Sequence, residues 1–215
     1  MTTTTTKATA VIALSCLSIG ATAGNATYTD ESTFLNSLSD PFFSEGYETY
    51  SVNTQTGSRV INLDYFDVNY QGFSDFGVSD IVDLPNGVQP LAGSQHLQAV
   101  YGGGPMTSIT FEFNEGTTAF GTYFSDVEAR PILYIVTLAA GGSAFSGTVT
   151  NGTGNGGVAY WGWNAFGSDI VSIEFRMGSL NGLNGVFFDE TTVVPAPGIA
   201  AMVLAGLTFT RRRRD

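Results

Sequence analysis

Two tryptophans and a tyrosine form the most distinctive group of side chains for ligand binding. Tyr160, Trp161 and Trp163 stand in one apolar run, and the chain holds no other tryptophan. Residues at i and i+2 of a β-strand point to the same face, so the two indoles would lie side by side. If exposed, they would give sugar rings flat apolar platforms with polar edges. If buried, they would belong to a sandwich core. Both interpretations stay open at this point, and exposure separates them.

The side chains that could carry catalysis are sparse. His96 is the only histidine, and no Gly-x-Ser-x-Gly sequence accompanies it. Asp126 and Glu128 would share one strand face and could imitate a glycosidase carboxylate pair, but this spacing is also ordinary surface patterning. Residues 152–157 contain Gly-x-Gly-x-x-Gly, yet a predicted strand at 158–163 follows instead of the helix that a nucleotide site requires. We therefore expect no enzymatic activity, and a glycan-active enzyme stays a distant alternative.

The elements that would position these residues are mostly strands. Residues 29–38 predict one short helix, with Thr29 or Asp30 as its N-cap. After Pro41 the apolar residues recur with period two, as at 109–113, 132–138 and 171–175. Gly, Asn, Asp and Ser bound these runs, and β-branched and aromatic residues fill them. The pattern predicts an all-β fold, an antiparallel β-sandwich.

Turn residues suggest how the strands connect. Gly141-Gly142 predicts a tight hairpin, and residues 114–116 (Asn-Glu-Gly) predict another reversal. In residues 60–70 the apolar phase flips, which we interpret as a bulge or as a strand buried on both faces. Residues 71–108 are the least regular part and predict long loops.

The N-terminus has the pattern of a secretory signal peptide. Lys7 precedes an uncharged, largely apolar stretch at 8–23, and Ala21-Thr22-Ala23 fits a small-x-small cleavage pattern. We expect a signal peptide at 1–23, with cleavage as late as residue 26 as the alternative. Cys16 is the only cysteine and lies in this segment, so the exported chain would have no disulfide.

The C-terminus combines a rigid motif, a short apolar segment and a basic end. Val194-Pro195-Ala196-Pro197-Gly198 leads into an uncharged apolar run at 199–210, and Arg211, Arg212, Arg213 and Arg214 follow. A membrane-spanning helix needs roughly 20 apolar residues, so this segment is a marginal permanent anchor. The arginines would stay on the cytoplasmic side. The combination is typical of temporary insertion, and a plain tail anchor is the alternative.

This tail resembles the PEP-CTERM sorting signal of bacterial surface proteins, in its Val-Pro-Ala-Pro-Gly variant. The resemblance implies that an exosortase, a membrane protease or transpeptidase, recognises residues 194–215 and removes them. It departs from the usual motif at Ala196, where a glutamate is common. Residues 105–194 resemble PEP-CTERM extracellular domains more loosely, which implies a jelly-roll, lectin-like body. We assign that body to residues 27–193.

Glu45 and Asp189 are candidate ligands of a structural calcium ion. In jelly-roll sugar-binding modules the first and last strands often lie side by side and share such an ion, and these two acids fall near the two ends of the body. Calcium takes six to eight oxygens, so backbone carbonyls would complete its shell. Two solvated carboxylates are the alternative.

The balance of acidic and basic residues limits the classes of partner that the chain can bind. The chain carries 8 basic and 19 acidic residues, and between the two terminal segments only Arg59, Arg130 and Arg176 are basic. Phosphate binding needs Lys and Arg, so nucleic acid is not expected. We predict a secreted, non-catalytic surface or exopolysaccharide-matrix protein of a Gram-negative-type bacterium, transiently inserted in the inner membrane by its tail. The alternative is a carbohydrate-binding module, stabilised by calcium, that binds extracellular polysaccharide.

Overall fold

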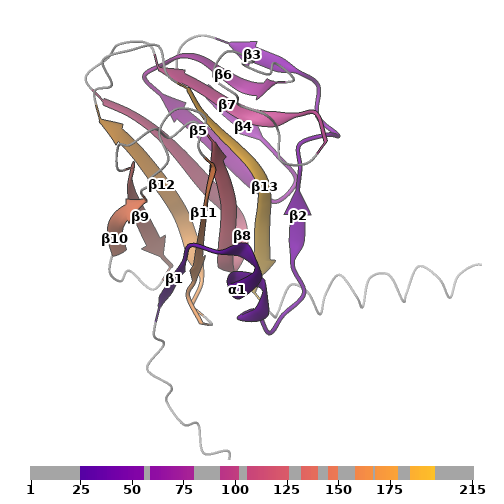
Figure 1. Ribbon diagram of the computed structural model, residues 1–215, viewed down its shortest axis with the longest axis vertical. Helices are drawn as coiled ribbons and strands as arrows, with labels where there is room; N and C mark the ends of the chain where they lie inside the picture. Colours follow the sequence, from indigo (N-terminus) through magenta and orange to yellow (C-terminus); the bar gives the residue numbers. More distant parts are fainter. Residues whose placement is uncertain are drawn as a thin grey trace, which may run out of the picture.

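The protein is a β-sandwich with one short helix at its rim (Figure 1). The structure, a computed structural model, describes residues 25–55, 59–79, 93–101, 106–125, 132–139, 145–149, 158–166, 168–178 and 185–196. All strand pairs within these residues are antiparallel. The elements are β1 (Ala26–Tyr28), α1 (Glu31–Asn36), β2 (Phe43–Glu45), β3 (Asn53–Gln55), β4 (Arg59–Asn62), β5 (Phe66–Gln71), β6 (Phe73–Ser79), β7 (His96–Tyr101), β8 (Met106–Ser125), β9 (Ile132–Leu138), β10 (Phe145–Val149), β11 (Val158–Asn164), β12 (Ile170–Gly178) and β13 (Gly185–Pro195).

One long strand, β8, belongs to both layers of the sandwich. Its first half pairs with β5 on one side and β12 on the other, which gives a first layer in the order β10-β9-β12-β8-β5-β4. Its second half pairs with β11 and β13, which gives a second layer that begins β1-β11-β8-β13. The beginning of β13 also pairs with β7, and the sheet extends from β7 to β6 and β3. The end of β13 pairs with β2.

The core between the layers is built of aromatic rings. Phe111 and Phe120 stand on the two halves of β8, and their ring centroids lie 5.0 Å apart. Trp161 of the second layer meets Phe175 of the first at 5.2 Å, with the rings edge to face. Edge-to-face pairs add about 0.5–1.5 kcal/mol each beyond the burial of their area. The all-β, antiparallel sandwich predicted from the sequence is confirmed.

The predicted N-terminal helix is also confirmed. Asp30 is the N-cap of α1, and its carboxylate accepts hydrogen bonds from Thr33 N (2.9 Å) and Ser32 Oγ (2.7 Å). The hydrogen bonds from Ser32 and Thr33 lower the pKa of Asp30. Phe34, the buried residue of the helix, packs against Tyr28 and Tyr160 in a small second cluster outside the main core. The helix thus closes the outer side of β11.

The interpretation of residues 60–70 as a bulged or doubly buried strand is wrong. The phase flip is a chain reversal: β4 and β5 form a hairpin, and Leu63 N donates to Phe66 O at 3.1 Å in its turn. Ile61 on one arm and Val68 on the other both point inward, because they are directly paired across the hairpin. When the turn of a hairpin is not recognised, the period-two apolar patterns of its two strands look like one strand whose pattern shifts by one residue.

Two further predictions about connections are wrong. Residues 71–108 contain the paired strands β6 and β7, so they are not long loops throughout, although 80–92 lie outside the described residues. The reversal predicted at 114–116 does not occur, because β8 runs through these residues without a break. The polar residues mark the place where β8 passes from one layer to the other. Gly141-Gly142 lies outside the described residues, but β9 and β10 on either side form the expected antiparallel pair.

A glutamate fixes the segment that leads into β7. Glu48 Oε1 accepts backbone hydrogen bonds from Ser94 N and Gln95 N, both at 2.6 Å, and Oε2 accepts one from Ser94 Oγ at 3.1 Å. The backbone hydrogen bonds from Gln95 and Ser94 lower the pKa of Glu48 from its ordinary value.

We predict that Gly162→Ala destabilises the sandwich. Gly162 of β11 lies beneath Phe34, and an added Cβ would stand 2.8 Å from Phe34 Cδ2 and 2.9 Å from its Cγ. The buried ring has to shift, which costs about 1–3 kcal/mol. Thermal unfolding measures the effect. Gly46→Ala is the matched control, because no atom lies within 4 Å of its added Cβ. Equal melting temperatures for the two variants would contradict the packing described.

We also predict that Glu48 makes stability depend on pH. Its pKa is lower in the folded chain than in the unfolded chain, so its contribution is present above the ordinary glutamate pKa and is lost as pH falls through the folded value. Glu48→Gln should therefore reduce stability near neutral pH and make little difference in strong acid. Urea unfolding across this pH range measures it. A difference between the two proteins that grows towards low pH would contradict the assignment.

Candidate functional site

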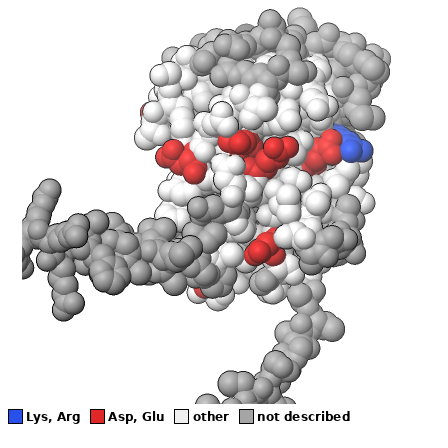
Figure 2. Space-filling model, turned by 180° about the vertical axis from the view of Figure 1, so that it is seen from behind, with Lys and Arg blue, Asp and Glu red and all other residues white. Residues whose placement is uncertain are grey.

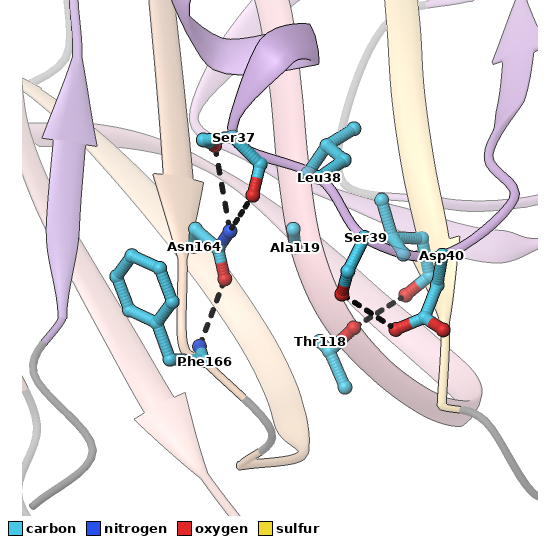
Figure 3. A pocket seen from close by; sticks show the side chains of 9 residues that line it. Ser37, Leu38, Ser39, Asp40, Thr118, Ala119, Asn164 and Phe166 are labelled. Atoms are coloured by element: carbon cyan, nitrogen blue, oxygen red, sulfur yellow. Dashed lines mark hydrogen bonds between the residues drawn. The ribbon is translucent and has the colours of Figure 1, made fainter. Parts of the chain in front are cut away.

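A pocket of about 290 Å³ opens at the rim of the sandwich where α1, β8, β11 and β13 meet (Figure 3). This volume is at the lower end of the roughly 300–1,000 Å³ typical of small-molecule sites. Its wall combines apolar with hydroxyl, amide and carboxylate side chains. The described residues that line it are Ser37, Leu38, Ser39, Asp40, Thr118, Ala119, Asn164, Phe166 and Val194.

An exposed aromatic ring stands at one side of the pocket. Phe166 is 48% exposed and has a φ of 45°, in the left-handed region that bulky residues rarely adopt. It occupies a tight turn in which Ser168 N donates to Ala165 O at 3.2 Å. Gly or Asn would adopt this backbone at no steric cost. A solvent-facing phenyl ring in a strained position contributes little to folding, and such outliers are enriched at ligand sites.

Asn164 holds this turn and forms the floor of the pocket beside it. Its Oδ1 accepts a hydrogen bond from Phe166 N at 2.8 Å, an Asx-type turn that stabilises the unusual backbone. Its Nδ2 lies 3.5 Å from both Ser37 O and Ser37 Oγ, which makes two long hydrogen bonds (Figure 3). These distances leave the amide N–H groups weakly engaged, so a ligand oxygen in the pocket could compete for them.

The opposite side of the pocket is polar. Ser39 Oγ donates to Asp40 Oδ2 at 3.3 Å, and Thr118 Oγ1 donates to the backbone oxygen of Val194 at 3.4 Å (Figure 3). Asp40 is the one charged side chain among the described lining residues. A single carboxylate beside hydroxyl and amide groups, opposite an aromatic ring, suits a neutral polyhydroxylated ligand. Among the described lining residues no second carboxylate accompanies Asp40, as a glycosidase-type pair would require.

The opposite face of the molecule from the view of Figure 1 is acidic. Asp67 on β5 lies directly across from Glu112 on β8, and Glu174 on β12 is the ion-pair partner of Arg176. Figure 2 shows Asp and Glu side chains in a band across this face, with a basic side chain at one end. Such a surface repels polyanions.

The structure places the tryptophan pair in the core. Trp161 is 1% exposed and Trp163 is 4% exposed, and both rings pack near Tyr134 at 4.9 and 6.0 Å. Tyr160 is buried as well and points to the other side of β11, against Phe34. No indole face is available to a sugar ring in this structure, so the burial favours the core interpretation of the pair.

Glu45 and Asp189 lie on neighbouring strands, in a buried polar cluster. Glu45 on β2 pairs with Thr191 on β13, two residues from Asp189, and both acids are buried. Glu45 Oε1 accepts from Tyr47 N (2.8 Å) and Oε2 from Tyr50 OH (3.1 Å), so hydrogen bonds engage both oxygens.

The same buried cluster changes the pKa of a tyrosine, and it contains few side chains that could bind a metal ion. Burial raises the pKa of Tyr47 well above its ordinary value, and the charges of Glu45 and Asp189 add to this. Among the described residues, no three His, Cys, Asp or Glu side chains gather as a ligand set. Hydrogen bonding accounts for the position of Glu45, and a calcium ion here stays a prediction.

The remaining predicted residues divide into buried and undescribed positions. His96 is 1% exposed within β7 and is not a loop residue, which removes it from solvent. Asp126, Glu128, the signal segment and residues 197–215 lie outside the described residues, so the tail helix and Arg211 to Arg214 stay predictions. No helix in the described parts of the chain is long and apolar enough to cross a membrane. Val194 and Pro195 are described as the last two residues of β13, and Ala196 follows them.

Sequence reasoning missed Phe166, Asn164 and Asp40. The available signal was a phenylalanine placed between turn-forming residues, in Asn164-Ala165-Phe166-Gly167-Ser168. A large apolar residue in a turn has no obvious core role, and it could have been singled out as an exposed ring. The proximity of Asp40 could not be predicted, because it depends on how α1 docks on β11.

Comparison with known proteins gives distant structural similarities alone. No protein-family model and no curated protein sequence matches the chain. A family 11 carbohydrate-binding module from Clostridium thermocellum, in complex with a β-1,3-1,4-mixed-linked tetrasaccharide, is 11% identical over 66% of this chain and 98% of that chain (TM-score 0.38). A mutant of CBM29-2, a family 29 carbohydrate-binding module, is 9% identical over 72% of this chain and 91% of that chain (TM-score 0.42). The enzymatically active domain of bacteriophage CBA120 tailspike protein 4 is 14% identical over 66% of this chain and 19% of that chain (TM-score 0.39). Similarities at this level give no information about function, so a functional proposal has to be based on the pocket.

Proposed function

We propose that the body of this protein is a non-catalytic module that binds a neutral saccharide in the pocket between Phe166 and Asp40. The observation that carries the proposal is the exposed Phe166 ring, held at positive φ by the Asn164 side chain at the mouth of a polar pocket. An aromatic ring can stack on the apolar face of a sugar while the surrounding amide and hydroxyl groups bind its hydroxyls. The single carboxylate and the acidic surface disfavour an anionic glycan.

The proposed setting is the outside of a Gram-negative-type bacterium. The signal peptide and the PEP-CTERM-like tail support export followed by exosortase processing, transient insertion in the inner membrane and delivery to the cell surface or exopolysaccharide matrix. In that setting a saccharide-binding body would attach the protein to extracellular polysaccharide. The absence of a second carboxylate or histidine among the described pocket residues supports a binding role over a catalytic one.

A second candidate is a structural matrix component that binds no glycan. The burial of Trp161 and Trp163 favours it, because it removes the aromatic pair that most resembled a sugar platform. The two candidates differ at Phe166: the ring is essential for the first and dispensable for the second.

We predict that Phe166→Ala weakens glycan binding without unfolding the protein. Losing an aromatic anchor costs about 2 kcal/mol of binding free energy, which weakens binding by roughly 30-fold. The measurement is affinity electrophoresis or calorimetry with neutral matrix polysaccharides, run with calcium and again with a chelator. Phe42→Ala is the matched control, because Phe42 is 44% exposed and is not among the lining residues. If Phe166→Ala binds as well as the wild type, or if no neutral glycan binds the wild type, the pocket proposal is wrong.

We predict that the secreted protein lacks the arginine cluster when the matching exosortase is present. The intact mass of the protein from the outer surface should fall short of the signal-cleaved chain by a tail that includes Arg211 to Arg214. In a strain without the exosortase the full tail should remain attached. Retention of the arginines in both strains would contradict sorting and favour a plain tail anchor.

A further inference from the structure

The first half of the sorting motif is part of the folded body. β13 ends at Pro195, beyond the boundary at residue 193 expected from the sequence. Val193 pairs with Phe120, Val194 with Ala119 and Pro195 with Thr117 of β8, with an irregularity between Val194 and Pro195. A proline lacks an N–H and is found in sheets at strand ends and bulges, which is its position here.

Side-chain packing fixes the same residues. Val194 is 2% exposed and belongs to the small cluster that includes Phe34, Ala119 and Tyr160. Pro195 is buried as well. The pocket wall described above includes Val194, so the motif and the candidate saccharide site share this corner of the fold.

Ala196 is the last described residue, and a backbone hydrogen bond ties it to β8. Its N–H donates to Gly116 O at 2.7 Å. The two chains approach closely here, because a Cβ added to Gly116 would lie 3.1 Å from the Ala196 Cβ. Val194, Pro195 and Ala196 are therefore held by ladder pairing, burial or a backbone hydrogen bond.

A peptide bond inside a paired, buried strand is a poor substrate. An enzyme that cuts a chain must bring the scissile bond into its own site, so cleavage concentrates where the backbone is exposed and unpaired. Reaching a bond before Ala196 would require the end of β13 to leave β8 and expose Val194. Such local opening costs free energy that a bond outside the strand does not require.

We infer that the sorting enzyme cuts this chain on the C-terminal side of Ala196, so that Val194, Pro195 and Ala196 stay in the mature protein as the end of β13. The inference rests on the proposed exosortase processing. In the step, the amide C–N bond breaks and the tail leaves as an amine that takes up one proton. The carbonyl carbon bonds to the oxygen of water, or to the nitrogen of an acceptor amine if the enzyme is a transpeptidase. Val194-Pro195 would then serve the fold, and the residues beyond Ala196 would serve the enzyme.

The test is the C-terminal peptide of the mature protein, isolated from a host with the matching exosortase and sequenced by mass spectrometry. The expected C-terminal residue is Ala196 or a later one before the arginine cluster. A mature chain that ends at Pro195 or earlier overturns the inference while leaving sorting intact. A chain that still carries Arg211 to Arg214 overturns the sorting proposal itself, and with it this inference. The two failures are therefore distinguishable in one spectrum.

A second measurement depends only on the fold. A non-specific protease acting on the purified full chain should shorten the tail and stop at or after Ala196. Val194→Ala removes buried apolar contact, so trimming past Ala196 should become about tenfold faster, because it follows the population of the opened strand. Val52→Ala is the control, since Val52 is 44% exposed. Rapid trimming of the wild type past Ala196, or equal rates for the two variants, overturns the inference.

Discussion

β8 is shared by both layers of the sandwich, and most of the structure depends on this sharing. The first half of the strand pairs with β5 and β12 in one layer, and the second half pairs with β11 and β13 in the other. The continuity brings Phe111 and Phe120 to opposite walls of one core, where the rings of β5, β11, β12 and β13 meet them. The chain has a single cysteine, so no disulfide forms within it, and the burial of these rings stabilises the fold.

The second half of β8 also organises the corner of the molecule that holds the candidate site. Ala119 and Thr118 line the pocket, β11 on one edge leads into the Asn164–Phe166 turn, and β13 on the other edge ends at Pro195. Helix α1 covers this corner because Phe34 packs on Gly162, the one place where β11 has no side chain in the way. The candidate saccharide site and the end of β13 are therefore neighbours, because both lie beside the second half of β8.

The sequence predicted what depends on local pattern. Period-two alternation identified β9 and β12, and the Asp30 cap identified α1, because these signals reside in adjacent residues. It failed where tertiary pairing decides. Residues 114–116 have turn composition, yet they lie inside β8, between a half that pairs with β5 and β12 and a half that pairs with β11 and β13. The phase flip after Ile61 is a hairpin turn, which alternation by itself cannot distinguish from a bulge.

The candidate site was beyond sequence reasoning for a related reason. Tryptophans attract attention as sugar platforms, but Trp161 and Trp163 fill the space between the layers, whereas the exposed ring is a phenylalanine in a turn. Whether an aromatic residue faces solvent is decided by what packs over it, and here α1 and the opposite sheet cover every ring of β11 while the turn beyond it stays open.

The proposed function depends on the stacking of a neutral saccharide on Phe166 in the pocket. The most direct measurement is an NMR titration of the isotope-labelled protein with neutral oligosaccharides cut from matrix polysaccharide. Saturable shifts are expected only for the Phe166 ring, the Asn164 side-chain amide and the neighbouring Ser39 and Thr118 backbone signals. Nuclear Overhauser effects should place sugar protons close to the ring. Saturable shifts elsewhere, with those signals unmoved, would contradict the proposed function.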